Sequence, residues 1–108
     1  MAKLRHLAIS TANPDETAEF FENLFSFKRV GTLQDHPLAD GHFLSDGSLN
    51  VAILRFKSDQ GPIPADRLGL HHFGVVVDDL DETLRRAVEL GGIPIEEGEM
   101  DGGFEHKF

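Results

Sequence analysis

Two histidines, His6 and His72, are the residues whose type and spacing point most directly to chemistry. A neutral imidazole is a common ligand for divalent zinc, iron, nickel and manganese. A single histidine on a strand is more often a hydrogen-bonded, partly buried side chain. Here two histidines occupy equivalent places in two similar segments, and we therefore interpret them as ligands of one metal ion. Two protein ligands bind a metal weakly, so we expect a carboxylate to complete the site.

The neighbours of both histidines leave room for a ligand. Side chains alternate across a strand, so His6 shares a face with the small residue Ala8. By the same rule His72 shares a face with Gly74. On a regular strand, His71 and His72 point to opposite faces. We therefore predict that His71 is structural or lies at the sheet edge, and that His72 is the ligand.

Other polar residues offer weaker alternatives. Glu99, Glu105 and Asn50 carry oxygen atoms that could join a metal site, but each is simpler to interpret as a solvated side chain. A second metal site or a polar loop is consistent with the cluster of His36, Asp40, His42 and Asp46, and the loop is the favoured interpretation. The hydroxyl residues occur at helix starts and turns, where capping explains them, so no Ser-His-Asp triad is indicated.

Helix and strand patterns follow each histidine segment. Asn13 suits a helix N-cap, Pro14 suits the first helical position, and Glu16 suits the acidic place of a capping box. Asp78 or Asp79 can cap a second helix that ends at Gly91-Gly92. We predict strands at Arg5–Ser10, Phe27–Leu33, Gly41–Leu44, Leu49–Phe56, Leu70–Val77 and Phe104–Phe108, with a tight turn at Asp46-Gly47. A further strand is predicted to start with Ile93–Ile95.

An internal repeat connects the two halves. His6 and His72 are related by a shift of 66 (72 − 6), and the same shift relates Asp15-Glu16-Thr17 to Asp81-Glu82-Thr83. Core positions also match, namely Leu4 with Leu70, Ile9 with Val75, Leu24 with Leu90, and Phe27 with Ile93. We therefore predict two βαβββ modules, at residues 1–62 and 67–108, which together form one domain. The second module ends before its last strand.

Composition excludes several classes of protein. The 108 residues carry 10 basic and 19 acidic side chains, a net charge of −9, which disfavours nucleic acid and anionic membranes as partners. No apolar run approaches the roughly 20 residues that span a bilayer. Cysteine is absent, which excludes disulfides and thiolate metal sites and is typical of a cytoplasmic protein.

Three segments resemble a known superfamily. Arg5–Ile9 and Leu70–Asp79 resemble the opening strands of vicinal-oxygen-chelate proteins, and Phe20–Phe25 resembles the end of their first helix. This superfamily includes glyoxalase I, methylmalonyl-CoA epimerase, extradiol dioxygenases and the bleomycin resistance proteins. The resemblance implies an α+β fold in which two tandem βαβββ modules, with curved mixed sheets, form a cleft.

The resemblance also implies a metal site. Metal-using members take ligands from the first and last strand of each module, and the first-strand positions match His6 and His72. The last-strand position of the first module falls on Ala52, which cannot bind a metal. Its counterpart in the second module lies past Phe108. The implied cofactor is a divalent ion, Fe²⁺, Mn²⁺, Ni²⁺ or Zn²⁺.

Two functions follow as expectations. The first is a metal-dependent lyase, isomerase or ring-cleaving dioxygenase that acts on a small oxygenated substrate chelated to the ion. The alternative is a metal-free protein of the bleomycin-resistance type that binds a small molecule. Because the predicted second module lacks a strand, we expect either a longer natural polypeptide or a second chain that fills the gap in a homodimer.

Overall fold

The computed structural model describes residues 2–100 and 103–107, with side chains through residue 95. The chain divides into two compact units. One contains Lys3–Val76, and the other contains Val77–Phe108 together with Met1–Ala2. Within the described ranges, no helix has the length and apolar character needed to cross a membrane.

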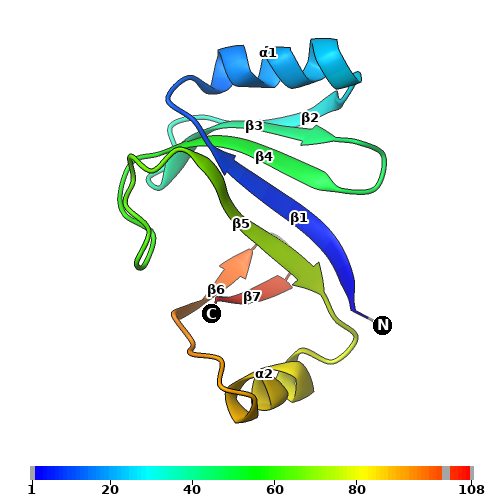
Figure 1. Ribbon diagram of the computed structural model, residues 1–108, viewed down its shortest axis with the longest axis vertical. Helices are drawn as coiled ribbons and strands as arrows, with labels where there is room; N and C mark the ends of the chain where they lie inside the picture. Colours follow the sequence, from blue (N-terminus) through cyan, green and yellow to red (C-terminus); the bar gives the residue numbers. More distant parts are fainter. Residues whose placement is uncertain (1, 101–102, 108) are drawn as a thin grey trace. The chain divides into compact units, whose positions relative to one another are not determined.

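The first unit consists of a five-stranded mixed sheet and one helix (Figure 1). Its elements in chain order are β1 (Lys3–Ser10), α1 (Pro14–Phe25), β2 (Lys28–Leu33), β3 (Ala39–Ser45), β4 (Asn50–Phe56) and β5 (Gly69–Val76). The strand order is β2-β3-β4-β1-β5, in which β1 is parallel to β4 and all other neighbours are antiparallel. The predicted α+β class is confirmed, and the five strands predicted here are all present.

Local chemistry explains where α1 begins and ends. The side chain of Asn13 accepts a hydrogen bond from the backbone N–H of Glu16, and its amide group donates to the Glu16 carboxylate, both at 3.2 Å. This is the predicted N-cap, and Pro14 follows it at the start of the helix. Ser26 ends the helix because it takes the left-handed conformation, with φ of 60°.

Hydrophobic residues cover both faces of the sheet. The cluster beside α1 contains Ala18, Leu44, Val51 and Ile53, with Ile9, Phe21 and Phe27 packed against it. A second cluster contains Ala8, Ala39, Ala52 and Leu54, with Leu33, Phe43 and Phe56 packed against it. Neighbouring residues of β4 alternate between these clusters, so the second cluster lies on the face opposite α1. We call this second surface the alanine face.

The pairing of β1 with β5 is symmetric under the same shift of 66 that relates the two halves of the sequence. Leu7 lies opposite Phe73, and these two positions are equivalents under the shift. The flanking pairs exchange under it as well: they are His6 with Gly74, and Ala8 with His72. A two-fold pseudo-axis therefore passes through the Leu7–Phe73 pair and relates the two histidines.

Each strand of this pair carries a bulge just before its histidine. The ladder shifts register at Arg5 in β1 and at His71 in β5, and these two residues are also equivalents under the shift. At each bulge, two residues of one strand lie opposite a single residue of its partner. The predicted regular alternation is therefore interrupted at the two places that position His6 and His72.

The second unit contains α2 (Leu80–Glu89), β6 (Glu96–Met100) and β7 (Gly103–Lys107), and β6 pairs with β7 antiparallel. Asp79 caps α2, because its side chain accepts from the backbone N–H of Glu82 at 3.1 Å. The strand predicted to start with Ile93–Ile95 is present, but it starts later, at Glu96. Pro94 has no backbone N–H to give to a ladder. The strand predicted at 104–108 corresponds to β7, and Phe108 lies outside the described residues.

Candidate functional site

His6 and His72 face each other across the β1–β5 pair. Their Nε2 atoms are 3.3 Å apart, and their ring centroids are 5.2 Å apart with planes inclined at 40°. Both side chains are half-buried. The two sequence-predicted ligands, 66 residues apart, are therefore brought together on one face of one sheet.

The distance between these two nitrogens suits a shared metal ion. Nitrogens bound to one tetrahedral ion at about 2.0–2.1 Å lie about 3.3–3.4 Å apart. Without a metal, the same 3.3 Å separation allows a hydrogen bond between the two rings. The two imidazoles thus present their Nε2 atoms at the spacing of neighbouring metal ligands.

Small residues surround the two histidines. Ala8 lies opposite both His72 and Ala52, and both alanines have 0% exposed surface. Ala52 has only a methyl group at the position where the resemblance implies a ligand. Asn50 lies opposite His6 in the parallel register of β1 and β4. The side chains of Glu99 and Glu105, the other predicted oxygen donors, lie outside the described part of the chain.

His71 does not point away from His72, and the prediction made from regular alternation is wrong. Its Nδ1 atom lies 2.8 Å from Nδ1 of His72, and its ring stacks on Phe56 with centroids 4.1 Å apart. Phe56 packs on the alanine face. The β-bulge is the reason, because it removes the alternation between residues 71 and 72. Nothing in the sequence around the two adjacent histidines indicates a bulge.

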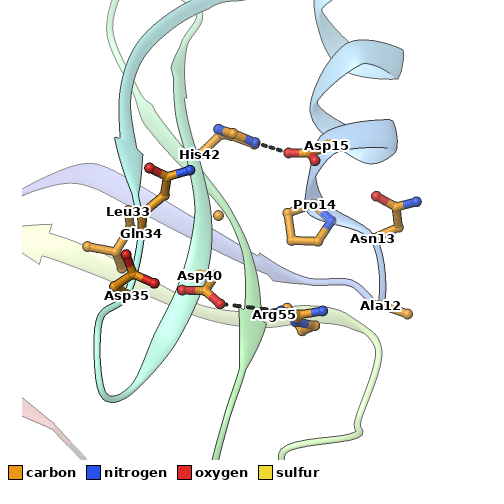
Figure 2. A pocket seen from close by; sticks show the side chains of 11 residues that line it. Ala12, Asn13, Pro14, Asp15, Leu33, Gln34, Asp35, Asp40, His42 and Arg55 are labelled. Atoms are coloured by element: carbon orange, nitrogen blue, oxygen red, sulfur yellow. Dashed lines mark hydrogen bonds and ion pairs between the residues drawn. The ribbon is translucent and has the colours of Figure 1, made fainter.

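A separate pocket of about 530 Å³ lies between the first turn of α1 and the neighbouring ends of β2, β3 and β4 (Figure 2). Within it, buried His42 donates from Nε2 to the Asp15 carboxylate at 2.5 Å. In the neutral ring, Nδ1 then accepts from the Thr32 hydroxyl at 3.0 Å. These contacts connect α1, β3 and β2. Sequence reasoning missed them, because the partners lie 27 and 10 residues away and no motif relates them.

Asp40 lies at the edge of the same pocket. Its carboxylate accepts from Arg55 at 3.3 Å and is paired with Lys57 at 3.2 Å (Figure 2 shows the Arg55 contact). Desolvation alone would raise the pKa of Asp40, but the hydrogen bonds and positive charges of Lys57 and Arg55 together outweigh it and lower the pKa below 3.8. This carboxylate is therefore committed to a structural ion-pair network.

The four residues of the predicted polar cluster have separate roles. His36 Nδ1 accepts from the backbone N–H of Leu38 at 3.1 Å, and Asp46 holds the turn between β3 and β4. Among the side chains that the structure describes, no group of three or more His, Cys, Asp or Glu residues is arranged to hold a metal ion.

Comparison with solved structures shows the same fold. A hypothetical protein from Bacillus halodurans C-125 has a TM-score of 0.76 and 22% identity, with 94% of this chain and 79% of that chain covered. Methylmalonyl-CoA epimerase in complex with methylmalonyl-CoA and NH₄⁺ has a TM-score of 0.69 and 18% identity, covering 89% and 74%. A Streptomyces coelicolor epimerase variant with 2-nitronate-propionyl-CoA has a TM-score of 0.68 and 18% identity, covering 87% and 75%.

A known protein family matches nearly the whole length of this chain. No curated protein matches it. The family model described as Glyoxalase/Bleomycin resistance protein/Dioxygenase superfamily matches residues 3–108, which agrees with the resemblance of the two histidine strands. The chain therefore belongs to the Glyoxalase/Bleomycin resistance protein/Dioxygenase superfamily.

Proposed function

We propose that His6 and His72 bind one divalent metal ion and that the protein is an enzyme acting on a small oxygenated substrate. The observation that carries this proposal is the 3.3 Å separation of the two Nε2 atoms on one face of the sheet. The remaining ligands would be a carboxylate outside the described side chains and oxygen atoms of the substrate. A bound divalent ion supplies Lewis-acid stabilisation of negative charge on a substrate oxygen.

The residues around the two histidines would give the substrate its surroundings. Ala8, Ala52 and Gly74 are small residues on the strands beside the two imidazoles. The alanine face next to them is apolar, so it would shield the reacting part of a substrate from water. Because two structural relatives carry acyl-CoA compounds, methylmalonyl-CoA is the first substrate to test.

Metal binding by purified protein tests the proposal. Metal-free protein is titrated with Zn²⁺, Ni²⁺, Mn²⁺ and, without oxygen, Fe²⁺, and the metal retained after dialysis is measured by elemental analysis. Protein concentration is taken from peptide-bond absorbance, because the chain has no Trp or Tyr. We expect close to one ion per chain in the wild type and its loss in a His6→Ala/His72→Ala double variant.

His36→Ala is the matched control, because among the described hydrogen bonds the ring of His36 contacts only the backbone N–H of Leu38, and the variant keeps the backbone carbonyl that accepts from Lys57. We expect it to bind like the wild type. Equal binding by the double variant and the wild type would contradict the assignment of His6 and His72. An absence of binding by every protein would contradict the metal proposal itself.

The second candidate function is metal-free binding of a small apolar molecule. The alanine face favours it, because Leu33, Phe43 and Phe56, which pack on the buried Ala8 and Ala52, are only partly buried and leave apolar surface on the side that carries the histidines. A ligand that binds only the folded protein raises the melting temperature. If this function is correct, an aromatic or acyl-CoA ligand raises Tm equally with and without a metal chelator. An effect that the chelator abolishes would favour the enzyme.

We also propose a cytoplasmic homodimer, because the cysteine-free sequence suits a reducing compartment and β5 pairs only with β1 in the described sheet. Light scattering after size exclusion measures the assembly: twice the 11.9 kDa chain mass supports a dimer, and a single chain mass contradicts it.

A further inference from the structure

His71 stands at an irregular point of β5. Ala8 lies opposite His72, while the next residue of β1, Ile9, lies opposite Leu70, so His71 is the additional residue of a bulge. In a bulge, two consecutive residues face one residue of the partner strand. The bulge therefore releases His71 from the alternation that would direct it away from His72.

The contacts of His71 show where its ring lies. It stacks on Phe56 with an interplanar angle of 20°, and Phe56 belongs to the face that carries Ala8 and Ala52. Its Nδ1 atom is 2.8 Å from Nδ1 of His72, whose Nε2 atom is 3.3 Å from Nε2 of His6. Three imidazoles thus form a row with His72 in the middle. Its Nδ1 atom contacts His71, and its Nε2 atom contacts His6.

The 2.8 Å contact constrains the hydrogens of His72. Two ring nitrogens at this distance share one hydrogen, so one ring donates and the other accepts. If Nδ1 of His72 donates, its Nε2 carries a lone pair toward the place it shares with His6. If His71 donates instead, a neutral His72 carries its hydrogen on Nε2 and cannot bind a metal there.

We propose that His71 is a positioning residue that accepts the Nδ1 hydrogen of His72 and so fixes Nε2 of His72 as a metal ligand. The inference rests on the proposed metal function. Metal-binding histidines generally donate their second N–H to an acceptor that sets the tautomer and the ring orientation. Here the acceptor is another imidazole, which the stacking on Phe56 holds in place.

The first repeat shows that this arrangement does not follow from the bulge alone. The equivalent bulged residue is Arg5, whose guanidinium group donates to the backbone carbonyl of Ser48 at 3.2 Å. Arg5 has no acceptor atom to offer a histidine. The bulge beside His72 therefore carries an imidazole that can accept a hydrogen bond, whereas the side chain at the bulge beside His6 can only donate.

Two substitutions separate the roles of the His71 ring. His71→Phe keeps an aromatic ring over Phe56 but removes the acceptor, whereas His71→Asn keeps an acceptor close to the place of Nδ1 but removes the ring. Arg5→Met is the control, since it changes the equivalent bulge without touching an acceptor. Thermal unfolding and an amide NMR spectrum of each variant establish that it is folded.

The first measurement is the tautomer of His72 in metal-free, ¹⁵N-labelled protein, read from long-range proton–nitrogen NMR correlations. We expect the Nδ1–H form in the wild type, in His71→Asn and in Arg5→Met, and a shift toward the Nε2–H form in His71→Phe. An Nε2–H form in the wild type overturns the proposal, and this result needs no variant to fold.

The second measurement is the Kd for Co²⁺, followed by its visible absorption. We expect His71→Phe to weaken binding about 10–100-fold, with His71→Asn and Arg5→Met close to the wild type. Wild-type affinity in His71→Phe overturns the positioning role while leaving His6 and His72 as ligands. If the wild type binds no metal, the proposed function fails, and the tautomer measurement still decides whether His71 orients His72.

Discussion

At the level of single side chains, Gly74 leaves little free space beside His6 at the candidate site. A Cβ atom at position 74 would lie 3.2 Å from the Cβ atom of His6 and 3.8 Å from its ring. Such a contact is tighter than ordinary van der Waals packing, so His6 would have to move by a few tenths of an ångström. The absence of a side chain at Gly74 is therefore part of what sets the position of His6.

We predict that Gly74→Ala weakens metal binding more than it weakens folding. The added methyl displaces His6, and a change in the Nε2–Nε2 separation from 3.3 Å weakens chelation. Metal Kd and chemical unfolding are both measured. Gly31→Ala is the control, because position 31 is also a strand glycine and its added Cβ would meet only Phe43, at 3.4 Å. Unchanged Kd in Gly74→Ala would show that His6 has room to adjust.

At the level of helices and strands, the N-caps illustrate what local chemistry can predict. Asn13 and Asp79 are equivalents in the two repeats, and each accepts a hydrogen bond from the backbone N–H three residues later. The sequence pattern identified Asn13 and narrowed the second cap to Asp78 or Asp79. A cap depends on residues within one turn, so its chemistry is visible in the sequence alone.

We predict that Asn13→Ala lowers the free energy of unfolding by about 1 kcal/mol, because the backbone N–H of Glu16 loses its side-chain acceptor. Asn13→Ser keeps an acceptor and should retain most of the stability. Urea denaturation compares the three proteins. Equal losses in both variants would mean that the Asn13 amide contact with the Glu16 carboxylate, rather than the cap, is what stabilises α1.

The strands show which features of the fold could be predicted from the sequence and which could not. The places of β1 to β5 were predicted because each has an apolar pattern, and the facing of His6 and His72 followed from the repeat. The bulges were not predicted, because a bulge depends on how two strands pair and not on either strand alone. That omission placed His71 on the wrong face. The start of β6 was predicted too early for a simpler reason: Pro94 outweighs the apolar pattern of Ile93 and Ile95.

At the level of the whole molecule, charge makes opposing contributions to stability. The net charge of −9 means that carboxylates repel one another, so partial protonation in acid relieves repulsion. Asp46 opposes this trend. Hydrogen bonds from the backbone N–H groups of Leu49 and Ser48 lower the pKa of Asp46 below 3.8 in the folded chain. The unfolded chain therefore binds more protons at this site, and acid favours unfolding there.

We predict that the wild type is more stable than Asp46→Asn at pH 7 and that this difference closes as the pH falls below 3.8. Asparagine keeps an oxygen that accepts from Ser48 and Leu49, at 2.8 and 2.6 Å in the wild type, so the turn is preserved while its charge is lost. A charged acceptor forms the stronger hydrogen bond. Because the folded pKa is depressed, the stabilisation is present above 3.8 and is lost as the pH falls through the folded pKa. Denaturation midpoints of both proteins, measured between pH 7 and pH 2, give the difference in stability. The general relief of repulsion in acid affects both proteins alike, so it largely cancels in this difference. A difference that stays constant with pH would show that the charge of Asp46 does not stabilise the turn.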